Sequence, residues 1–239
     1  MIFYYIRHGE PIYDPDSLTE LGTKQAVALS KRLAIYGVDK VYTSTSNRAI
    51  ETAQPTCDLL KIEPEHLEFA HENNVWADLS VEKEDGSGRL WIFNSQKYKE
   101  LFCDKEIRDL GDNWYKHPEL KDLNCEKGIK RIYDESDAFF EALGYEHIRY
   151  TGKYRVKKSN DQRVAFFAHQ GFGLAFLSCI LDVPYPMFST HFNVGHSGLT
   201  VIEFKEVNGI AIPRMHTMSS DAHIYKEDLP LNYNNYIKF

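Results

Sequence analysis

Cysteine is scarce in this sequence, and positive charge is in the minority. The four cysteines, Cys57, Cys103, Cys125 and Cys179, are widely separated and form no C-x-x-C pair, which argues against a disulfide framework and against a zinc site. The 28 Lys and Arg residues face 35 Asp and Glu residues, and the net charge of -7 argues against a sequence-independent nucleic-acid binder and a polybasic membrane protein. Any bound anion must therefore be captured by a local cluster of positive groups.

Long apolar runs are also lacking. Residues 1–6 are apolar, but Arg7-His8-Gly9-Glu10 ends this run too early for the core of a signal peptide, and no other run has membrane-spanning length. Together with free thiols, this predicts a cytoplasmic protein with neither a membrane nor a nucleic acid as partner. The 239 residues, 43% of them hydrophobic, fit one domain with a sizeable core. Composition does not indicate an oligomeric state.

Buried strands and helices alternate along much of the chain. Runs of β-branched and aromatic residues without polar alternation predict strands at residues 2–6, 38–43 and 164–168. Helices are predicted after each of them, from Ser17 or Thr19 to Gly37, over 47–60 with an interruption or bend at Pro55, and over 171–181. Hydroxyls of residues 44–46 are expected to cap the second helix, and a last pair of strands is expected at 198–204 and 210–216.

This alternation predicts an α/β fold, a mainly parallel central sheet flanked by helices on both faces as a three-layer sandwich. The whole chain, 1–239, is expected to form one domain. Residues 82–162 are polar and rich in Lys and Tyr, with helical stretches near 94–102 and 126–143 and no clear strand pattern. We interpret this segment as a mainly helical insertion over the carboxyl ends of the strands.

Ligands of such sheets bind beyond the carboxyl ends of the strands. His8 and His169 each directly follow a predicted strand, so these distant residues are expected to converge, with Arg7 and Arg48 nearby. Phosphoryl transfer needs positive groups around the phosphate oxygens, an in-line nucleophile and an acid for the leaving oxygen. Arginine binds phosphate through two parallel hydrogen bonds, and a neutral imidazole is a competent nucleophile near neutral pH.

Four separate motifs resemble the histidine phosphatase superfamily, also called the phosphoglycerate mutase-like proteins. They are Arg7-His8-Gly9-Glu10, Leu18-Thr19-Glu20-Leu21-Gly22 with Gln25-Ala26, Arg48-Ala49 with Thr52-Ala53, and Ala168-His169 with Gly171. The resemblance spans about residues 2 to 204 and thins through the insertion. It implies that His8 becomes phosphorylated, and that Arg7, Arg48 and His169 form the rest of the phosphate pocket.

The resemblance also implies a glutamate as proton donor after the second helix. Glu72 is the best-placed candidate, with Glu68 and Glu82 as alternatives, although the family's usual leucine and glycine around this position are absent here. Asp14 stands where many relatives have an asparagine, and an aspartate beside phosphate would repel it. We therefore expect Asp14 to point away from the pocket or not to be equivalent.

The expected activity is hydrolysis of a small phosphomonoester. Mutases of the family carry a Glu-Arg-x-Tyr-Gly stretch that we do not find here, which favours the phosphatase branch. A mutase and a binding protein that has lost turnover are the alternatives. No metal or organic cofactor is expected, because arginine and histidine supply the positive charge, and the expected partner is a small phosphorylated metabolite.

Other candidate groups have ordinary explanations. We expect His191 and His196 to be structural or rim residues rather than metal ligands. The basic run from Lys153 to Arg163 is interpreted as solvent-exposed. The aromatic residues of the insertion, among them Trp91, Phe93, Trp114 and Tyr115, either shape a lid or bury the insertion's own core.

Overall fold

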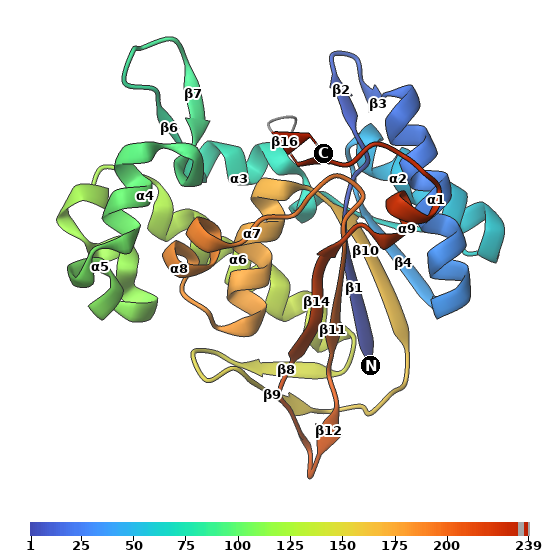
Figure 1. The fold of residues 1–239 in the computed structure, drawn as a ribbon. Coiled ribbons are helices and arrows are strands. Elements are labelled where there is room, and N and C mark those ends of the chain that lie inside the picture. Colours follow the sequence, from blue (N-terminus) through green and yellow to red (C-terminus); the bar gives the residue numbers. More distant parts are fainter. Residues whose placement is uncertain (234–236, 239) are drawn as a thin grey trace.

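A twisted six-stranded sheet forms the centre of the computed structural model, which describes residues 1–233 and 237–238 (Figure 1). The strands lie in the order β14 (Arg214–Ser220), β11 (Leu199–Glu203), β1 (Ile2–Arg7), β10 (Arg163–Ala168), β4 (Lys40–Ser44) and β5 (Glu65–Leu67). Strands β1, β10, β4 and β5 are parallel, and β11 is antiparallel to both β1 and β14. The predicted mainly parallel α/β sheet is confirmed.

Helices cover both faces of this sheet because successive strand residues point to opposite sides. On one face, Tyr4 and Ile6 of β1 share a core with α1 (Glu20–Tyr36) and α2 (Asn47–Leu60). On the other face, Phe3 and Tyr5 share a core with α6 (Cys125–Ala142) and α7 (Gln170–Leu181). Figure 1 shows α1 and α2 on one side of the sheet and α6 and α7 on the other.

Capping residues explain where the first predicted helix, α1, begins and ends. Thr19 caps α1, because its Oγ1 accepts a hydrogen bond of 2.9 Å from the Gly22 N–H. The same helix ends at Gly37, whose φ of +82° suits glycine. Helix α2 continues through Pro55 to Leu60, so the predicted interruption does not occur.

The segment between α2 and β10 contains most of the remaining helices. Its helices are α3 (Glu72–Leu79), α4 (Gln96–Cys103), α5 (Lys105–Asp109) and α6, with short 3-10 turns at Glu68–Ala70, Ile92–Asn94, Gly111–Lys116 and Pro118–Leu120. It also contains strands that the sequence did not indicate, namely β6 (Ser80–Glu82), β7 (Arg89–Trp91), β8 (Tyr145–Ile148) and β9 (Lys153–Val156). These strands have only three or four residues, too few for a clear alternating pattern.

Strands β8 and β9 belong to a second sheet with β13 (Ile210–Ala211) and β12 (Glu206–Val207). The strand predicted at 210–216 is therefore divided, since its first residues join this second sheet and the rest belong to β14. Two hairpins, β2 (Pro11–Tyr13) with β3 (Asp16–Leu18) and β6 with β7, project from the same end of the molecule (Figure 1). The remaining elements are α8 (Tyr185–His191), α9 (Ala222–Lys226), β15 (Asn232–Tyr233) and β16 (Ile237–Lys238).

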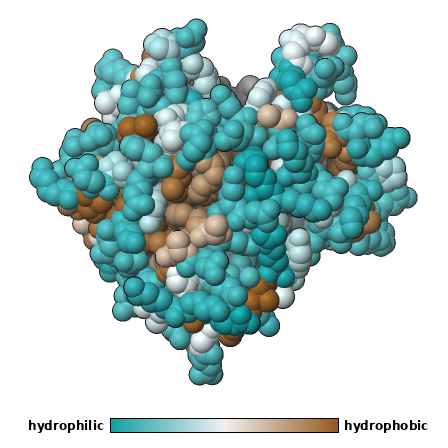
Figure 2. All heavy atoms as spheres, turned by 180° about the vertical axis from the view of Figure 1, so that it is seen from behind, coloured by the Kyte–Doolittle hydropathy of each residue, from teal (hydrophilic) through white to brown (hydrophobic). Residues whose placement is uncertain are grey.

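The surface is mostly polar. On the face seen in Figure 2, hydrophilic residues cover most of the surface and apolar residues gather near its middle. Within the described part of the chain, no helix is both long and apolar enough to cross a membrane.

Candidate active site

His8 lies directly after β1, at the carboxyl edge of the sheet, and its side chain is buried. Its backbone N–H donates to the carbonyl of Ala168 (2.9 Å), and its carbonyl accepts from the Ser197 N–H (3.0 Å). The Nδ1 atom is 2.7 Å from the carbonyl oxygen of Gly9. Because a carbonyl can only accept, Nδ1 carries the proton and Nε2 keeps its lone pair. No described residue hydrogen-bonds this Nε2, so its lone pair is available for reaction or for binding a ligand.

Close backbone packing explains several residues that follow His8. A Cβ atom on Gly9 would lie 2.7 Å from the Gly22 carbonyl oxygen, so the loop after β1 can approach α1 only with glycine here. The Gly9 N–H donates to Oγ1 of Thr52 on α2 (2.9 Å), and the Glu10 N–H donates to Oε1 of Gln25 on α1 (2.8 Å). These residues fix the loop that carries His8.

His169 follows β10 and is fully buried beside His8, with ring centroids 5.2 Å apart. Its Nε2 lies 2.8 Å from Oγ of Ser44 and 3.0 Å from Oγ of Ser46. Ser46 is the residue before α2 but makes no side-chain capping bond, so the predicted capping role of its hydroxyl is wrong. The hydroxyl contacts the second histidine of the site instead, because the parallel strands β4 and β10 bring both to one edge.

Both predicted arginines are buried at this edge. Arg7 donates to the Val194 carbonyl (2.8 Å) and to Nε2 of His196 (2.8 Å). Arg48, in the first turn of α2, pairs through Nη1 with Oδ1 of Asp16 (2.7 Å) and through Nη2 with Oε2 of Glu72 (3.2 Å). Arg48 is thus held between two carboxylates.

Glu72 is the glutamate that the fold brings to the two histidines. One nitrogen of His8, one nitrogen of His169 and one carboxylate oxygen of Glu72 all lie within 4.8 Å of one another. Its Oε1 accepts from the Gly171 N–H (2.9 Å), and its Oε2 is 3.7 Å from Nδ1 of His169. Glu68 and Glu82, the two alternatives, are exposed. The same three side chains offer a donor set that can hold a metal ion, although the expected histidine chemistry needs none.

Burial and neighbouring cations keep the site histidines neutral. The pKa of His8 is held well below its usual value by burial and then by Arg7, His169 and Arg48. Burial, followed by Arg48, His71 and Arg7, likewise lowers the pKa of His169 strongly. In His196, burial and Arg7 lower the pKa to about 3, so its ring stays a neutral acceptor for Arg7. A neutral His8 is the form that can attack phosphorus.

A cavity of about 560 Å³ opens above these groups, between the two projecting hairpins and the start of α3. Its polar lining consists of Asp16, Arg48, His71, Glu72 and Asn73. Its aromatic lining consists of Tyr13, Trp76 and Trp91. Arg48 and Glu72 belong both to this lining and to the cluster around the two histidines.

Comparison with known proteins agrees with this geometry. Residues 3–100 match the model of the histidine phosphatase superfamily (branch 1). Over these residues the chain is similar to the histidine phosphatase superfamily. The resemblance stated from the motifs is thereby confirmed. No curated protein sequence is significantly similar to the chain.

Solved structures of the superfamily share the fold at low sequence identity. A phosphoserine phosphatase from Entamoeba histolytica in complex with 3-phosphoglyceric acid has 17% identity and a TM-score of 0.60, covering 93% of this chain and 98% of its own. A mycobacterial glucosyl-3-phosphoglycerate phosphatase has 15% identity and a TM-score of 0.58, with 92% and 99% covered. The α-ribazole phosphatase from Shigella flexneri has 16% identity and a TM-score of 0.58, with 92% and 97% covered. All three similar structures are described as phosphatases.

Other groups that sequence reasoning considered lie away from the histidines or play other parts. Asp14 is exposed in the turn between β2 and β3, whereas Asp16, two residues later, reaches Arg48. His191 is exposed at the end of α8. In the basic run, Arg155 and Lys157 pair with Glu146 on the neighbouring strand β8. These ion pairs agree with a solvent-facing strand.

The insertion's aromatic residues divide into two groups. Phe93, Trp114 and Tyr115 are buried in the core, where Trp114 stacks on Tyr185 with centroids 5.5 Å apart. Trp91 is only half-buried and lines the cavity over the site. The second alternative, burial in the insertion's own core, thus applies to Phe93, Trp114 and Tyr115, whereas Trp91 has a face toward the cavity.

Asp16, Ser44 and His196 are site neighbours that sequence reasoning did not assign to the site. Asp16 binds Arg48, Ser44 binds His169, and His196 binds Arg7. For Ser44 a signal was available, because it ends a strand parallel to the one that precedes His169.

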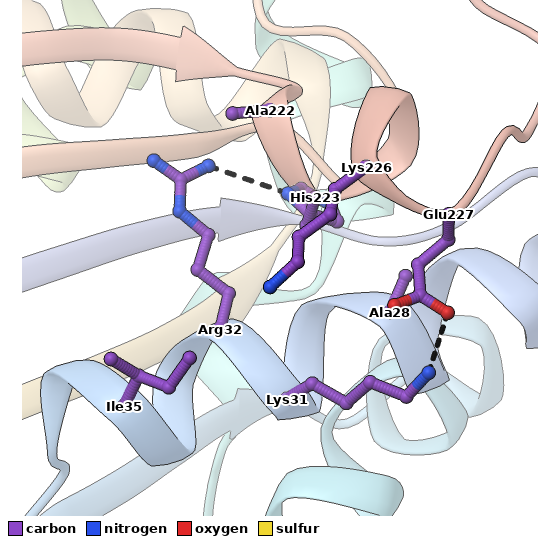
Figure 3. Close-up of a pocket in the computed structure, with 8 residues that line it drawn as sticks. All are labelled: Ala28, Lys31, Arg32, Ile35, Ala222, His223, Lys226 and Glu227. Atoms are coloured by element: carbon purple, nitrogen blue, oxygen red, sulfur yellow. Dashed lines mark hydrogen bonds and ion pairs between the residues drawn. The ribbon is translucent and has the colours of Figure 1, made fainter.

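A second cavity of about 160 Å³ lies between α1 and α9, with Lys31, Arg32, His223 and Lys226 in its lining (Figure 3). Lys31 pairs with Glu227 (2.5 Å), and Nη1 of Arg32 contacts Nδ1 of His223 (3.4 Å), as Figure 3 shows. His223 also contacts Oγ of Ser197 (2.8 Å), whose N–H donates to the His8 carbonyl. This cavity therefore borders the scaffold behind His8.

Proposed function

We propose that this protein is a phosphatase that hydrolyses a small phosphomonoester through a phosphohistidine on His8. The observation that carries the proposal is the convergence of three groups, the unpaired Nε2 of His8, the Glu72 carboxylate and the His169 ring. A nucleophile, an acid and a phosphate ligand are what a two-step transfer requires. The phosphatase names of the similar structures support the same reaction class.

In the first step, Nε2 of His8 attacks phosphorus and a P–N bond forms. The bond between phosphorus and the leaving oxygen breaks, and that oxygen takes a proton from Glu72. Arg7 and Arg48 bind the equatorial phosphate oxygens. The bound phosphate competes with Glu72 for Arg48. When Arg48 binds the phosphate instead, the Glu72 carboxyl group is released and lies beside the leaving oxygen.

His169 completes the phosphate pocket. Its Nδ1 is buried without a hydrogen-bond partner among the described residues. We assign the proton to Nδ1, which then donates to a phosphate oxygen, while Nε2 accepts from one of the two seryl hydroxyls. Ser44 and Ser46 in this way set the tautomer of His169.

In the second step, a water molecule replaces the departed alcohol and attacks phosphorus. Glu72, now ionised, accepts the water proton, the P–N bond breaks, and inorganic phosphate and neutral His8 are regenerated. The substrate is a small phosphorylated metabolite, and we place the reaction in the cytoplasm, where the four free cysteines remain thiols.

A quenched reaction with a radiolabelled phosphoester tests the proposal. We expect acid-labile label on the wild-type protein and none on His8→Ala. Label retained undiminished by His8→Ala overturns the assignment of the nucleophile. The folded state of the variant is checked by circular dichroism and thermal unfolding, because His8 is buried.

Two further activity assays distinguish the proposed phosphatase from two other candidate functions. The binding of Arg48 by both Asp16 and Glu72 favours, as a second candidate, a phospho-ligand-binding protein without turnover. Turnover of para-nitrophenyl phosphate that His8→Ala abolishes excludes that candidate. A mutase would convert 3-phosphoglycerate to its 2-isomer, whereas a phosphatase would release phosphate.

A further inference from the structure

Two indole rings form one wall of the cavity above Glu72. Trp76 and Trp91 pack edge to face, with ring centroids 4.8 Å apart and an interplanar angle of 87°. Trp91 is backed in turn by Phe93, with the rings stacked at 5.5 Å and 15°. Both indoles line the same 560 Å³ cavity as Arg48 and Glu72. We call this pair the indole corner.

Trp91 is fixed against the catalytic edge by Gly171. A Cβ atom on Gly171 would overlap the six-membered ring of Trp91, so the indole lies directly on the first turn of α7. The N–H of the same Gly171 donates to Oε1 of Glu72 (2.9 Å). The β6–β7 hairpin therefore places Trp91 against Gly171, whose backbone N–H binds Glu72, the proposed acid.

Trp76 is fixed to the acid through the helix α3. It lies four residues after Glu72, and side chains at this spacing project from the same face of a helix. In the proposed reaction, Glu72 gives its proton to the leaving oxygen. The substituent on that oxygen must then lie within reach of the indole corner.

The charges of the cavity restrict this substituent further. Among the described residues that line it, Arg48 is the one lysine or arginine, and it already faces Asp16 and Glu72. With a phosphate bound at Arg48, a second negative group would meet two carboxylates and no further lysine or arginine among the described lining residues. His71 and Asn73 add hydrogen-bonding groups at the rim, where Nδ1 of His71 accepts from the Asn73 N–H (3.3 Å).

From these placements we infer that the indole corner binds the leaving group, and that the preferred substrates are phosphomonoesters whose leaving group carries a planar, apolar ring and no second negative charge. Flat rings bind well on aromatic side chains, and an unpaired charge beside carboxylates is disfavoured. The inference rests on the proposed phosphatase activity and names its substrate class.

Three alkyl phosphates of similar leaving-group chemistry test the inference, namely ethyl, benzyl and 4-carboxybenzyl phosphate. We expect kcat/KM for benzyl phosphate to exceed that for ethyl phosphate by about tenfold or more, because the ring gains contact with the indoles. We expect 4-carboxybenzyl phosphate to be worse than benzyl phosphate by about tenfold, because of like-charge repulsion.

Variants assign these ratios to the residues. Trp91→Ala should lower the benzyl-to-ethyl ratio about tenfold, and Asp16→Asn should reduce the discrimination against 4-carboxybenzyl phosphate about threefold. Tyr225→Ala removes an exposed aromatic side chain on α9 and should leave both ratios within about twofold. Ratios taken within one variant cancel any general loss of active protein.

The possible failures are distinguishable. Absence of His8-dependent turnover of all three esters overturns the proposed function and this inference with it. Turnover with a benzyl-to-ethyl ratio near one, or a ratio that Trp91→Ala does not change, overturns the inference alone. Equal use of benzyl and 4-carboxybenzyl phosphate overturns its charge component.

Discussion

Two buried histidine clusters in this protein have opposite electrostatics. In the active site, burial and the arginines lower the pKa of both His8 and His169. His147, on β8, is also buried, but it lies between Oδ1 of Asp137 (2.7 Å) and Oδ2 of Asp182 (3.1 Å). Burial alone would lower its pKa, yet the two carboxylates outweigh burial and raise it. Burial therefore does not decide the protonation state of a histidine; its charged neighbours do.

The two clusters also serve different ends. The His147 cluster joins β8, α6 and the end of α7, where Asp182 also accepts from the N–H groups of Thr151 and Gly152 (both 2.8 Å). Its ring stacks on Tyr154 at 4.3 Å and 8°. Both ring nitrogens of His147 have a carboxylate partner, which suits a structural cross-link. In the candidate active site, in contrast, Nδ1 of His169 has no hydrogen-bond partner among the described residues, which suits a ligand-binding site.

The largest expected effect concerns the proposed acid. Glu72→Gln should lower kcat for ethyl phosphate by about 10² to 10⁴-fold, because no group then protonates the leaving oxygen. With para-nitrophenyl phosphate, whose leaving group needs no proton, label on His8 should instead accumulate, because the water attack lacks its base. Glu68→Gln, at an exposed glutamate bonded to Thr45, is the matched control. Equal losses in the two variants would contradict the role of Glu72.

A stability measurement tests the other cluster. His147→Ala should cost about 3 kcal/mol of unfolding free energy, since it leaves two carboxylates without their shared cation. His216→Ala removes an exposed histidine that pairs with Glu203 (3.1 Å) and should cost less than about 0.5 kcal/mol. Urea unfolding gives both values. A His147→Ala variant as stable as wild type would show that the cluster is not a cross-link.

The contribution of His147 should depend on pH with a definite sign. Its folded-state pKa is raised, so its stabilisation is fully present below the unfolded-state pKa of about 6.5 and is lost as the pH rises through the folded-state value. The difference in unfolding free energy between wild type and His147→Ala should therefore narrow between about pH 6 and pH 9. If the difference in unfolding free energy instead widens over this range, the His147 ring is neutral between the two carboxylates.

The sequence was most informative where a local pattern and a topological rule coincide. Strands β1 and β10 are continuous apolar runs that end in charge, and parallel strands deliver their carboxyl ends to one edge. The convergence of His8 and His169 follows from these two facts. The placement of Glu72 needed the family resemblance as well, because no pattern in the residues around it separates it from Glu68.

Contacts between distant segments could not be predicted from local rules. Ser46 has the sequence signature of a helix cap, but a buried imidazole competes for its hydroxyl. The short strands β8 and β9 pair with each other, and β9 also pairs with β13, which follows more than 50 residues later. His196 reaches Arg7 from a loop before β11, and nothing in its neighbours indicates this. In each case the partner is set by tertiary packing.

The two aspartates of the β2–β3 hairpin test whether a position in the family motif identifies the residue that acts at the phosphate pocket. Asp14 occupies the position that relatives fill with asparagine, but it is exposed in the turn, whereas Asp16 binds Arg48 at 2.7 Å. Asp16→Asn should lower KM for ethyl phosphate by about tenfold, because it removes a negative charge beside Arg48, the proposed phosphate ligand. Asp14→Asn should change it by less than about twofold. An effect of Asp14→Asn equal to that of Asp16→Asn would mean that the turn folds into the pocket when phosphate binds. Asp14, which the family motif places near the phosphate, would then face the substrate even though it is exposed in the free protein.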